Sequence, residues 1–174
     1  MIRPATKNDA ADLARIYSPY VTGTSISFEE EPPSSNEIVK RVEDAVLWLV
    51  CEVDGIVVGY AYAGTFNSRP AYRWSVEVST YVESANHRTG VGSLLLDELL
   101  RQLRDAGFVN AFSGIALPNP ASIGLFESRG FVQKALYESV GFKNGQWHDV
   151  GWWQLELRSP RVPPPVFSTQ TMTE

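Results

Sequence analysis

A glycine-containing turn near the middle of the chain joins a β-rich run to a leucine-rich run. The β-rich run ends at about Val82, the turn holds Gly90 and Gly92, and leucines follow with helical spacing over residues 91–106. The start of a helix exposes unpaired backbone N–H groups and the positive end of the helix dipole. This order of strand, turn and helix predicts an anion site, and pyrophosphate is the anion that it favours.

Two other kinds of glycine loop fit this turn poorly. A P-loop needs a lysine after its last glycine, whereas Gly92 is followed by Ser93 and Leu94. A dinucleotide-binding loop needs a third glycine, and Leu95 stands in its place. An ordinary helix-entry turn remains the alternative to an anion site.

The strand before the turn carries a candidate general base, Glu77. Alternation along residues 74–82 puts Glu77 on the same face as Ser75 and Ser79. Burial beside apolar side chains such as Trp74 would raise the pKa of its carboxyl group toward neutral pH, where a general base works best. Because the strand leads directly into the predicted anion site, we expect a catalytic role for Glu77 rather than that of a solvated surface carboxylate.

Length and composition bound the class of protein. The chain has 174 residues, of which 44% are hydrophobic and 11% aromatic, so we expect one soluble domain with a sizeable core. A formal net charge of −5 argues against a general attraction to nucleic acid or to an anionic membrane. Cys51 is the only cysteine, and there is no apolar targeting segment. These features predict a cytoplasmic protein without a nucleic-acid, membrane or metal partner.

Strand and helix patterns alternate along residues 1–158. Asp54-Gly55 and Asn144-Gly145 are typical of tight turns between antiparallel strands. The whole pattern predicts an α/β fold in which a mixed central β-sheet is flanked by helices. The expected strands cover residues 2–4, 47–53, 56–62, 74–82, 108–117, 132–140 and 147–157, and the expected helices begin near residues 6, 35, 91 and 120.

The composition changes after Arg158. Four prolines, at positions 160, 163, 164 and 165, are followed by Ser, Thr and Glu without periodicity. We therefore assign residues 1–158 to the folded domain and expect residues 159–174 to form a disordered or loosely packed tail.

Six short motifs, in the same order, resemble those of the phosphinothricin N-acetyltransferases of the GNAT superfamily. The resemblance covers residues 1 to about 158, and several motifs in register are specific although each alone is weak. It implies the GNAT fold, acetyl-CoA as acetyl donor and, commonly, a homodimer. The motifs are Arg3-Pro4-Ala5-Thr6, Glu52-Val53-Asp54-Gly55, Tyr60-Ala61-Tyr62-Ala63-Gly64, Arg88-Thr89-Gly90-Val91-Gly92-Ser93, Leu117-Pro118-Asn119 and Trp147-His148-Asp149-Val150-Gly151.

The same resemblance implies an activity. Family members acetylate the α-amino group of glutamate-like amino acids such as phosphinothricin, methionine sulfoximine and arsinothricin. We therefore expect a small-molecule amine as acceptor, and direct attack on acetyl-CoA within a ternary complex. Glu77 matches the family's catalytic glutamate.

The resemblance also implies which residues bind. We expect main-chain groups of Thr80, Tyr81 and Val82 to pair with the pantetheine arm of acetyl-CoA, as an added strand pairs with a sheet edge. The expected pyrophosphate loop is Arg88, Thr89, Gly90, Val91, Gly92 and Ser93, with further cofactor contacts from Asn119 and Ser128, and the expected acceptor-binding residues are Phe28, Arg69, Tyr72 and Arg73.

Two positions depart from the family pattern. His87 stands where the pyrophosphate loop usually has Gln or Arg, and Phe126 stands where a histidine often pairs with the catalytic glutamate. Phenylalanine neither titrates nor donates a hydrogen bond. Two alternatives therefore stay open, namely an acetyltransferase for another amine, such as a polyamine or a protein N-terminus, and a CoA-binding module without turnover.

Overall fold

Seven strands form one mixed β-sheet in the computed structural model, which describes residues 1–167. Their order is β1-β2-β3-β4-β5-β7-β6, and the pair β4 and β5 is parallel whereas the other neighbours are antiparallel. The predicted α/β fold is confirmed. The strands are β1 (Ile2–Pro4), β2 (Leu47–Val53), β3 (Ile56–Thr65), β4 (Ser75–Val82), β5 (Asn110–Ala116), β6 (Val132–Lys143) and β7 (Gln146–Glu156), and the helices are α1 (Ala10–Gly23), α2 (Ser35–Asp44), α3 (Val91–Ala106) and α4 (Pro120–Glu127).

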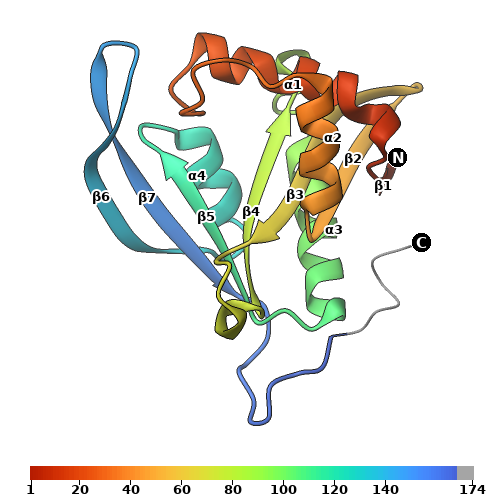
Figure 1. The fold of residues 1–174 in the computed structure, drawn as a ribbon, viewed down its shortest axis with the longest axis vertical. Helices are drawn as coiled ribbons and strands as arrows, with labels where there is room; N and C mark the ends of the chain where they lie inside the picture. The colour runs from red at the N-terminus through yellow and green to blue at the C-terminus, as the bar shows by residue number, and fades with distance from the viewer. Residues whose placement is uncertain (168–174) are drawn as a thin grey trace.

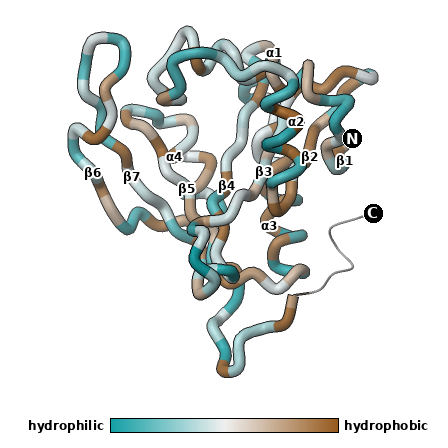
Figure 2. The backbone as a smooth tube through the Cα atoms, viewed as in Figure 1, coloured by the Kyte–Doolittle hydropathy of each residue, from teal (hydrophilic) through white to brown (hydrophobic). Residues whose placement is uncertain are grey.

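Helices cover both faces of the sheet (Figure 1). On one face, Leu13 and Ile16 of α1 and Ile38 of α2 belong to the same buried cluster as Val50 and Tyr60. On the other face, α3 and α4 share a second cluster with the remaining inward-facing strand residues. Figure 2 shows apolar and polar positions alternating along α3 and the central strands, as expected for elements with one buried side.

β4 and β5 pair only where they begin. Their register runs from Ser75 opposite Asn110 to Glu77 opposite Phe112, and no pairing continues beyond that position. Figure 1 shows the two arrows diverging toward their ends, with α4 beside β5. Strands that separate leave backbone N–H and C=O groups without strand partners on their facing edges. The divergence therefore exposes backbone groups that begin just after Glu77.

Both predicted hairpin turns are present. Asp54 and Gly55 connect β2 to β3, Asn144 and Gly145 connect β6 to β7, and all four residues have positive φ. This is the conformation that Asp-Gly and Asn-Gly turns supply. β6 is longer than expected, and with β7 it forms an arm that projects from the sheet (Figure 1). Its register against β7 shifts twice, between Gln133 and Ala135 and between Tyr137 and Gly141, where β6 bulges.

Residues 159–167 contact the domain. The Trp74 indole N–H donates to the Pro165 carbonyl at 2.9 Å, and the Phe167 ring lies 5.0 Å from the Phe108 ring. Residues 159–167 are therefore packed more closely than the expected loose tail, because the Phe167 ring contacts the core. Residues 168–174 of the expected tail lie outside the described residues.

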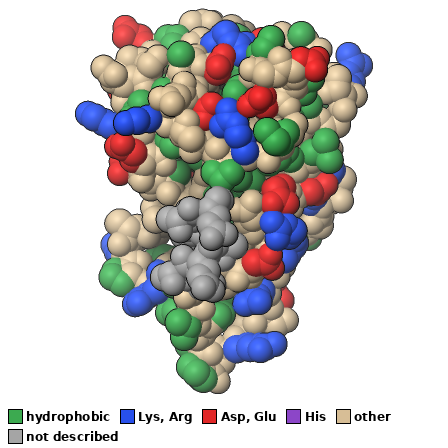
Figure 3. Space-filling model, turned by 90° about the vertical axis from the view of Figure 1, so that its right-hand side faces the viewer, with side chains coloured by type: hydrophobic (Ala, Val, Ile, Leu, Met, Phe, Trp, Pro, Cys, Tyr) green, Lys and Arg blue, Asp and Glu red, His purple; other side chains and the backbone are tan. Residues whose placement is uncertain are grey.

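The outer surface mixes both signs of charge. Figure 3 shows acidic and basic side chains interspersed on one side of the molecule. Within residues 1–167, none of the helices is long and apolar enough to cross a membrane. The same residues contain no cluster of three or more histidine, cysteine, aspartate or glutamate side chains that would hold a metal ion.

Candidate active site

Glu77 lies at the last paired position between β4 and β5. Its neighbours Val76 and Val78 are fully buried in the core beneath α3, so alternation directs the Glu77 side chain to the opposite face, on which α1 and α2 pack. Within residues 1–167, no hydrogen bond or ion pair engages its carboxylate, and burial raises the pKa of this carboxyl above its ordinary value. A half-buried, unpaired carboxylate at the start of a cleft is suited to accept a proton.

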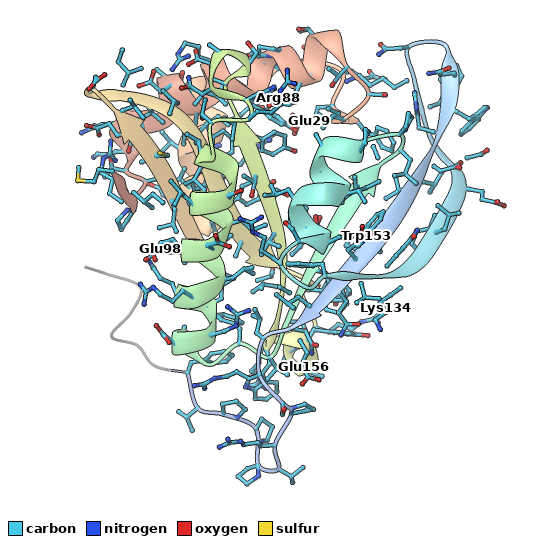
Figure 4. All side chains as sticks on the ribbon, turned by 180° about the vertical axis from the view of Figure 1, so that it is seen from behind. Glu29, Arg88, Glu98, Lys134, Trp153 and Glu156 are labelled. Atoms are coloured by element: carbon cyan, nitrogen blue, oxygen red, sulfur yellow. The ribbon has the colours of Figure 1, made fainter. Side chains whose placement is uncertain are left out.

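The start of α3 is open. Gly90 stands at the N-cap with a φ of 92°, and no side chain caps the helix. The preceding turn is shaped by Arg88, whose φ is 60°, and by the Thr89 hydroxyl, which donates to the Asn86 carbonyl at 2.7 Å. Figure 4 shows Arg88 at this end of α3. The first N–H groups of α3, from Val91 onward, are therefore left without a side-chain acceptor, as an anion site requires.

His87 is turned back toward the body of the protein. Its Nε2 atom lies 2.9 Å from the Val82 carbonyl oxygen and 3.0 Å from the Tyr20 hydroxyl. The Tyr20 hydroxyl also donates to the Val82 carbonyl, at 2.5 Å. His87 thus links the loop to the end of β4 and to α1, and the predicted anion site is left with backbone amides as its donors.

The hydrogen-bond register of β4 determines which backbone groups face the open edge. The Glu83 N–H donates to the Val58 carbonyl at 2.9 Å, and the Phe66 N–H donates to the Ser75 carbonyl at 3.4 Å. In an antiparallel ladder, directly opposed residues alternate between pairs that exchange hydrogen bonds and pairs that do not. The odd-numbered residues of β4 therefore bond to β3, and the even-numbered residues direct their backbone groups toward β5.

This register separates the residues expected to bind pantetheine. Thr80 directs its main-chain N–H and C=O groups into the gap between β4 and β5. Val82 directs its N–H there as well, whereas its carbonyl already accepts from the Tyr20 hydroxyl. Tyr81 instead exchanges main-chain hydrogen bonds with Tyr60, its partner on β3. Of the expected main-chain contacts, the geometry thus supports those of Thr80 and Val82, and Tyr81 lines the cleft with other atoms.

A narrow cleft of about 40 Å³ occupies the gap between the strands. The Thr80 hydroxyl is buried there without a hydrogen-bond partner. An extended amide-bearing arm would satisfy both this hydroxyl and the free edge of β4. The cleft is lined by Ile26, Ser79, Thr80, Tyr81, Ser113, Gly114, Ile115, Ala116, Asn119, Ser122 and Phe126.

Asn119 and Ser128 have structural hydrogen bonds at the two ends of α4. The Asn119 side-chain oxygen accepts from the Ser122 N–H at 3.1 Å, which is the capping role that competes with a cofactor contact. The Ser128 hydroxyl donates to the Leu125 carbonyl at 2.7 Å and accepts from Arg129. Asn119 borders the cleft, whereas Ser128 does not.

Phe126 is a core residue that borders the cleft. It is 3% exposed, and its ring meets the Phe131 ring edge-on at 5.0 Å. Phe126 cannot perform any acid–base role that the family's histidine has at this position, because phenylalanine does not titrate. Glu77, at the last paired position of β4 and β5, is left as the candidate base.

The expected acceptor residues lie in different surroundings. The Tyr72 ring lies 5.9 Å from that of Phe66, which stacks at 4.3 Å on Phe112, the strand partner of Glu77. Arg69 is exposed at the start of the same short turn. Tyr72 is thus linked to the strand position of Glu77 by a chain of aromatic contacts.

Phe28 and Arg73 each have further contacts. Phe28 belongs to the segment after α1 and lies against the β6–β7 arm, 6.1 Å from the His148 ring. The Arg73 guanidinium lies 5.0 Å from the centre of the Trp74 ring, and its Nε donates to the Pro70 carbonyl at 2.8 Å. Because these contacts occupy the guanidinium, Arg73 is the weakest of the expected acceptor residues.

A larger pocket, which the sequence analysis did not predict, lies on the face that carries Glu77. It has a volume of about 290 Å³ and is walled by five aromatic side chains together with residues of α2. The sequence pattern that could have predicted this pocket is the spacing of Tyr60 and Tyr62 on β3. With Trp48, the strand partner of Tyr62 on β2, they put three aromatic rings on one face of the sheet. The lining is Tyr17, Ile38, Arg41, Asp44, Ala45, Trp48, Tyr60, Tyr62, Gly64, Thr65 and Tyr81.

Comparison with known proteins agrees with this geometry. The model of the acetyltransferase (GNAT) domain family matches residues 2–152. A phosphinothricin N-acetyltransferase of Streptomyces viridochromogenes is 39% identical over 95% of this chain and 92% of its own length. An L-methionine sulfoximine/L-methionine sulfone acetyltransferase of Salmonella typhimurium is 34% identical over 93% of this chain and 97% of its own length.

Solved structures show the same relation. The crystal structure of a GNAT superfamily phosphinothricin acetyltransferase from Sinorhizobium meliloti in complex with acetyl-CoA superimposes with a TM-score of 0.90. It is 30% identical and covers 99% of this chain and 95% of that one. With a matching family model, an open α3 N-terminus and a split between β4 and β5, the chain belongs to the GNAT acetyltransferases and is an acyltransferase that uses acetyl-CoA.

Proposed function

We propose that the protein transfers the acetyl group of acetyl-CoA to the α-amino group of a glutamate-like small molecule of the phosphinothricin, methionine sulfoximine or arsinothricin type. The observation that carries the proposal is the place of Glu77, where the cleft between β4 and β5 begins. The acyl donor would enter on the cleft side, and the acceptor amine would approach on the face that carries the carboxylate. The names of the relatives support this acceptor class.

The proposed chemistry is direct attack within a ternary complex. An α-ammonium group must lose a proton before its nitrogen can attack, and the Glu77 carboxylate, with its pKa raised by burial, takes that proton. The C–N bond forms and the thioester C–S bond then breaks. The nitrogen loses a second proton as the intermediate collapses, and the leaving thiolate takes up a proton. A backbone N–H near Val78, where pairing between β4 and β5 ends, would stabilise the oxyanion.

In this proposal, the acyl donor lies along the open edge of β4. Its pyrophosphate would bind the backbone amides of the loop that runs from Arg88 to Ser93, at the start of α3. Its pantetheine arm would pair with Thr80 and Val82, with Tyr81 and Asn119 as walls of the cleft.

On the acceptor side, we propose that Arg69 and Tyr72 bind the anionic head group and that Phe28 forms the wall. A guanidinium fork and a phenol are suited to carboxylate, phosphinate and arsinate oxygens.

Two observations support an alternative acceptor, such as a polyamine or a protein N-terminus. Phe126 replaces the histidine often found in the family, and an aromatic pocket of about 290 Å³ adjoins the same face of the sheet. A glutamate-like side chain does not need so large an apolar wall. The alternative therefore differs in the acceptor and keeps the fold, the acyl donor and Glu77.

The test measures thiol release from acetyl-CoA by the purified protein with phosphinothricin, methionine sulfoximine, arsinothricin, ordinary amino acids and spermidine. We expect selective turnover of the glutamate analogues. Turnover of another amine with none of these would overturn the acceptor class. Binding of acetyl-CoA without turnover of any amine would instead support the non-catalytic module.

We also propose a homodimer. β6 is the edge strand of the sheet, and it exposes a row of large apolar side chains together with Trp147 on β7. An exposed apolar edge of this length is a typical association surface. Sedimentation equilibrium should give twice the chain mass of 19.3 kDa, and a monomer at micromolar concentration would refute the dimer. The row is Val132, Leu136, Tyr137, Val140 and Phe142.

Two further proposals concern location and boundaries. Cys51 is buried and unpaired, which suits the reducing cytoplasm. We propose that residues 1–158 are the catalytic domain, so that a chain ending at Arg158 keeps its kinetic constants. Loss of turnover in that shortened chain would mean that the catalytic domain extends beyond Arg158 and includes the Trp74–Pro165 contact.

A further inference from the structure

A single lysine on the β6–β7 arm holds the segment that follows α1. The Lys143 ammonium donates to three backbone carbonyls, those of Val21, Ser27 and Glu29, at 2.6, 2.6 and 2.7 Å. An ammonium group has three N–H donors, and all three are used here. No carboxylate in the described chain pairs with this ammonium, so its charge is met by carbonyl dipoles alone.

The three carbonyls define what the lysine fixes. Val21 lies in the last turn of α1, where carbonyls lack helical partners and a positive charge is stabilising, and that turn contains no basic residue of its own. Ser27 and Glu29 flank Phe28. Lys143 therefore joins the C-terminal end of α1 to the two residues on either side of Phe28.

The β6–β7 arm also makes space for the Phe28 ring, at Gly141. A Cβ atom added to Gly141 would lie 2.1, 2.5 and 2.7 Å from three atoms of that ring, so the ring occupies the space of the missing side chain. His148 lies beneath, with its Nε2 atom 3.1 Å from the Lys143 carbonyl oxygen. Lys143 and Gly141, two residues apart on β6, thus contact the backbone on either side of Phe28 and the Phe28 ring, respectively.

The other side of the segment is held by α1 and α2. The Tyr17 hydroxyl lies 2.7 Å from the Ser27 hydroxyl and donates to the Glu29 carboxylate at 3.0 Å. Arg41 forms two hydrogen bonds with the same carboxylate, at 2.7 and 3.1 Å. Figure 4 shows Glu29 at the end of the sheet where β4 and β5 diverge. Since Ile26 lines the cleft between those strands, the segment borders the site of the acyl donor as well.

We propose that Lys143 is a positioning residue for acyl transfer, which ties residues 24–34 to the β6–β7 arm and thereby sets the wall of the acceptor site. The proposal rests on the proposed function for the role of Phe28, and on the hydrogen bonds for the tie itself. It assigns the arm a part in acceptor binding through its contact with this segment.

The test compares Lys143→Met with Lys134→Met. Methionine keeps the length of the side chain and removes all three donors, and Lys134 is an exposed lysine on the same strand. For the best amine in the acceptor panel, we expect Lys143→Met to raise the acceptor KM about tenfold or more, because hydrogen bonds from a charged group are lost. kcat and the acetyl-CoA KM should change less, and Lys134→Met should change none of these constants.

Hydrogen exchange gives a readout that needs no substrate. Amides of residues 24–34 should exchange faster in Lys143→Met, while those of α3 keep their protection. If exchange is faster in Lys143→Met but the wild type turns over none of the amines, the role of Lys143 in holding residues 24–34 would stand and the proposed function would be refuted. Unchanged exchange, or a fall in kcat with an unchanged acceptor KM, as expected from a smaller folded fraction, would refute the positioning role.

Gly141→Ala provides a second variant that leaves Lys143 in place. The added methyl group should displace the Phe28 ring and raise the acceptor KM, with the lysine bonds kept. Lys143→Arg, which keeps the charge on a planar group that does not converge on three carbonyls in this way, should recover part of the loss. If Gly141→Ala and Lys143→Arg both leave the acceptor KM unchanged, the proposal fails even where Lys143→Met does not fold.

Discussion

The two edges of β4 differ in how far they are paired. Toward β3, the ladder runs without interruption from Gly59 opposite Val82 to Thr65 opposite Val76. Toward β5, it stops at Glu77. One edge is satisfied by the sheet, and the other leaves backbone groups for a ligand that brings its own amides. A single strand thus joins the fully paired part of the sheet to the cleft where we propose that the acyl donor binds.

The helix starts show the same contrast. α2 begins with a capping box, in which the Ser34 hydroxyl accepts from the Glu37 N–H and the Glu37 carboxylate accepts from the Ser34 N–H. α3 begins at Val91, and its N-cap residue, Gly90, has no side chain to cap it. Side-chain acceptors satisfy backbone N–H groups at the start of α2, whereas those at the start of α3 have no side-chain acceptor and are available to the expected anion. Substitutions of residues whose hydrogen bonds are satisfied within the protein should change stability alone. Substitutions of residues that we propose to meet a ligand should change the kinetic constants.

Glu77→Gln should have the largest effect. Glutamine keeps the shape of the side chain and removes the proton acceptor, so turnover should fall about 10²- to 10⁴-fold. Acetyl-CoA affinity, measured by calorimetry, should stay within about threefold, or about 0.7 kcal/mol, because the proposed pyrophosphate and pantetheine contacts come from other residues. Full activity in Glu77→Gln would remove the carboxylate from the mechanism.

Gly90→Ala should weaken binding of the acyl donor. Alanine is strained at a φ of 92°, so the turn should relax and move the first amides of α3. We expect the acetyl-CoA KM to rise about tenfold, which corresponds to about 1.4 kcal/mol. Gly55→Ala is the matched control, since Gly55 has a φ of 80° in the β2–β3 hairpin and its substitution should lower stability alone. Equal acetyl-CoA KM values in the two variants would contradict an anion site at Gly90.

Asp9→Asn should lower stability and leave the kinetics intact. The hydrogen bonds from Arg3 are the main cause that lowers the pKa of Asp9 to about 2. Because the folded-state pKa is depressed, this stabilisation is present above the ordinary value of 3.8 and is lost as pH falls toward 2. Denaturant unfolding at pH 7 should show a loss of about 2 kcal/mol. The gap between variant and wild type should narrow below pH 4; a constant gap would mean that Asp9 acts through packing.

Ser34→Ala should have the smallest effect. It removes the N-cap of α2 and should lower the free energy of unfolding by about 1 kcal/mol. Both KM values and kcat should match the wild type. A changed acceptor KM would show that α2, which walls the larger pocket, takes part in acceptor binding.

Much of this organisation was predictable from local sequence. The order of strands and helices, both hairpin turns and the glycine at the start of α3 follow from periodicity and turn chemistry, which act over a few residues. The strand that carries Glu77 was found by the same means. The match to the family model confirms the predicted superfamily.

Other features depend on contacts between distant residues. Lys143 meets Val21 across 122 positions of sequence, and a lysine near a turn ordinarily indicates solvent. Arg73 was grouped with Arg69 by proximity in sequence, yet its guanidinium lies on Trp74. The end of pairing between β4 and β5 depends on how two strands diverge in space, which no local pattern encodes.

We propose that Glu77 is the base, at the point where the fully paired and the unpaired edges of β4 meet. The most direct test is the pH dependence of kcat at saturating concentrations of both substrates, in wild type and in Glu77→Gln, because kcat reports ionisations within the complex. We predict that the wild-type rate rises through an ionisation above 4.5, the ordinary value for this carboxyl, and that this ionisation disappears in Glu77→Gln. The same ionisation in both proteins would contradict the claim.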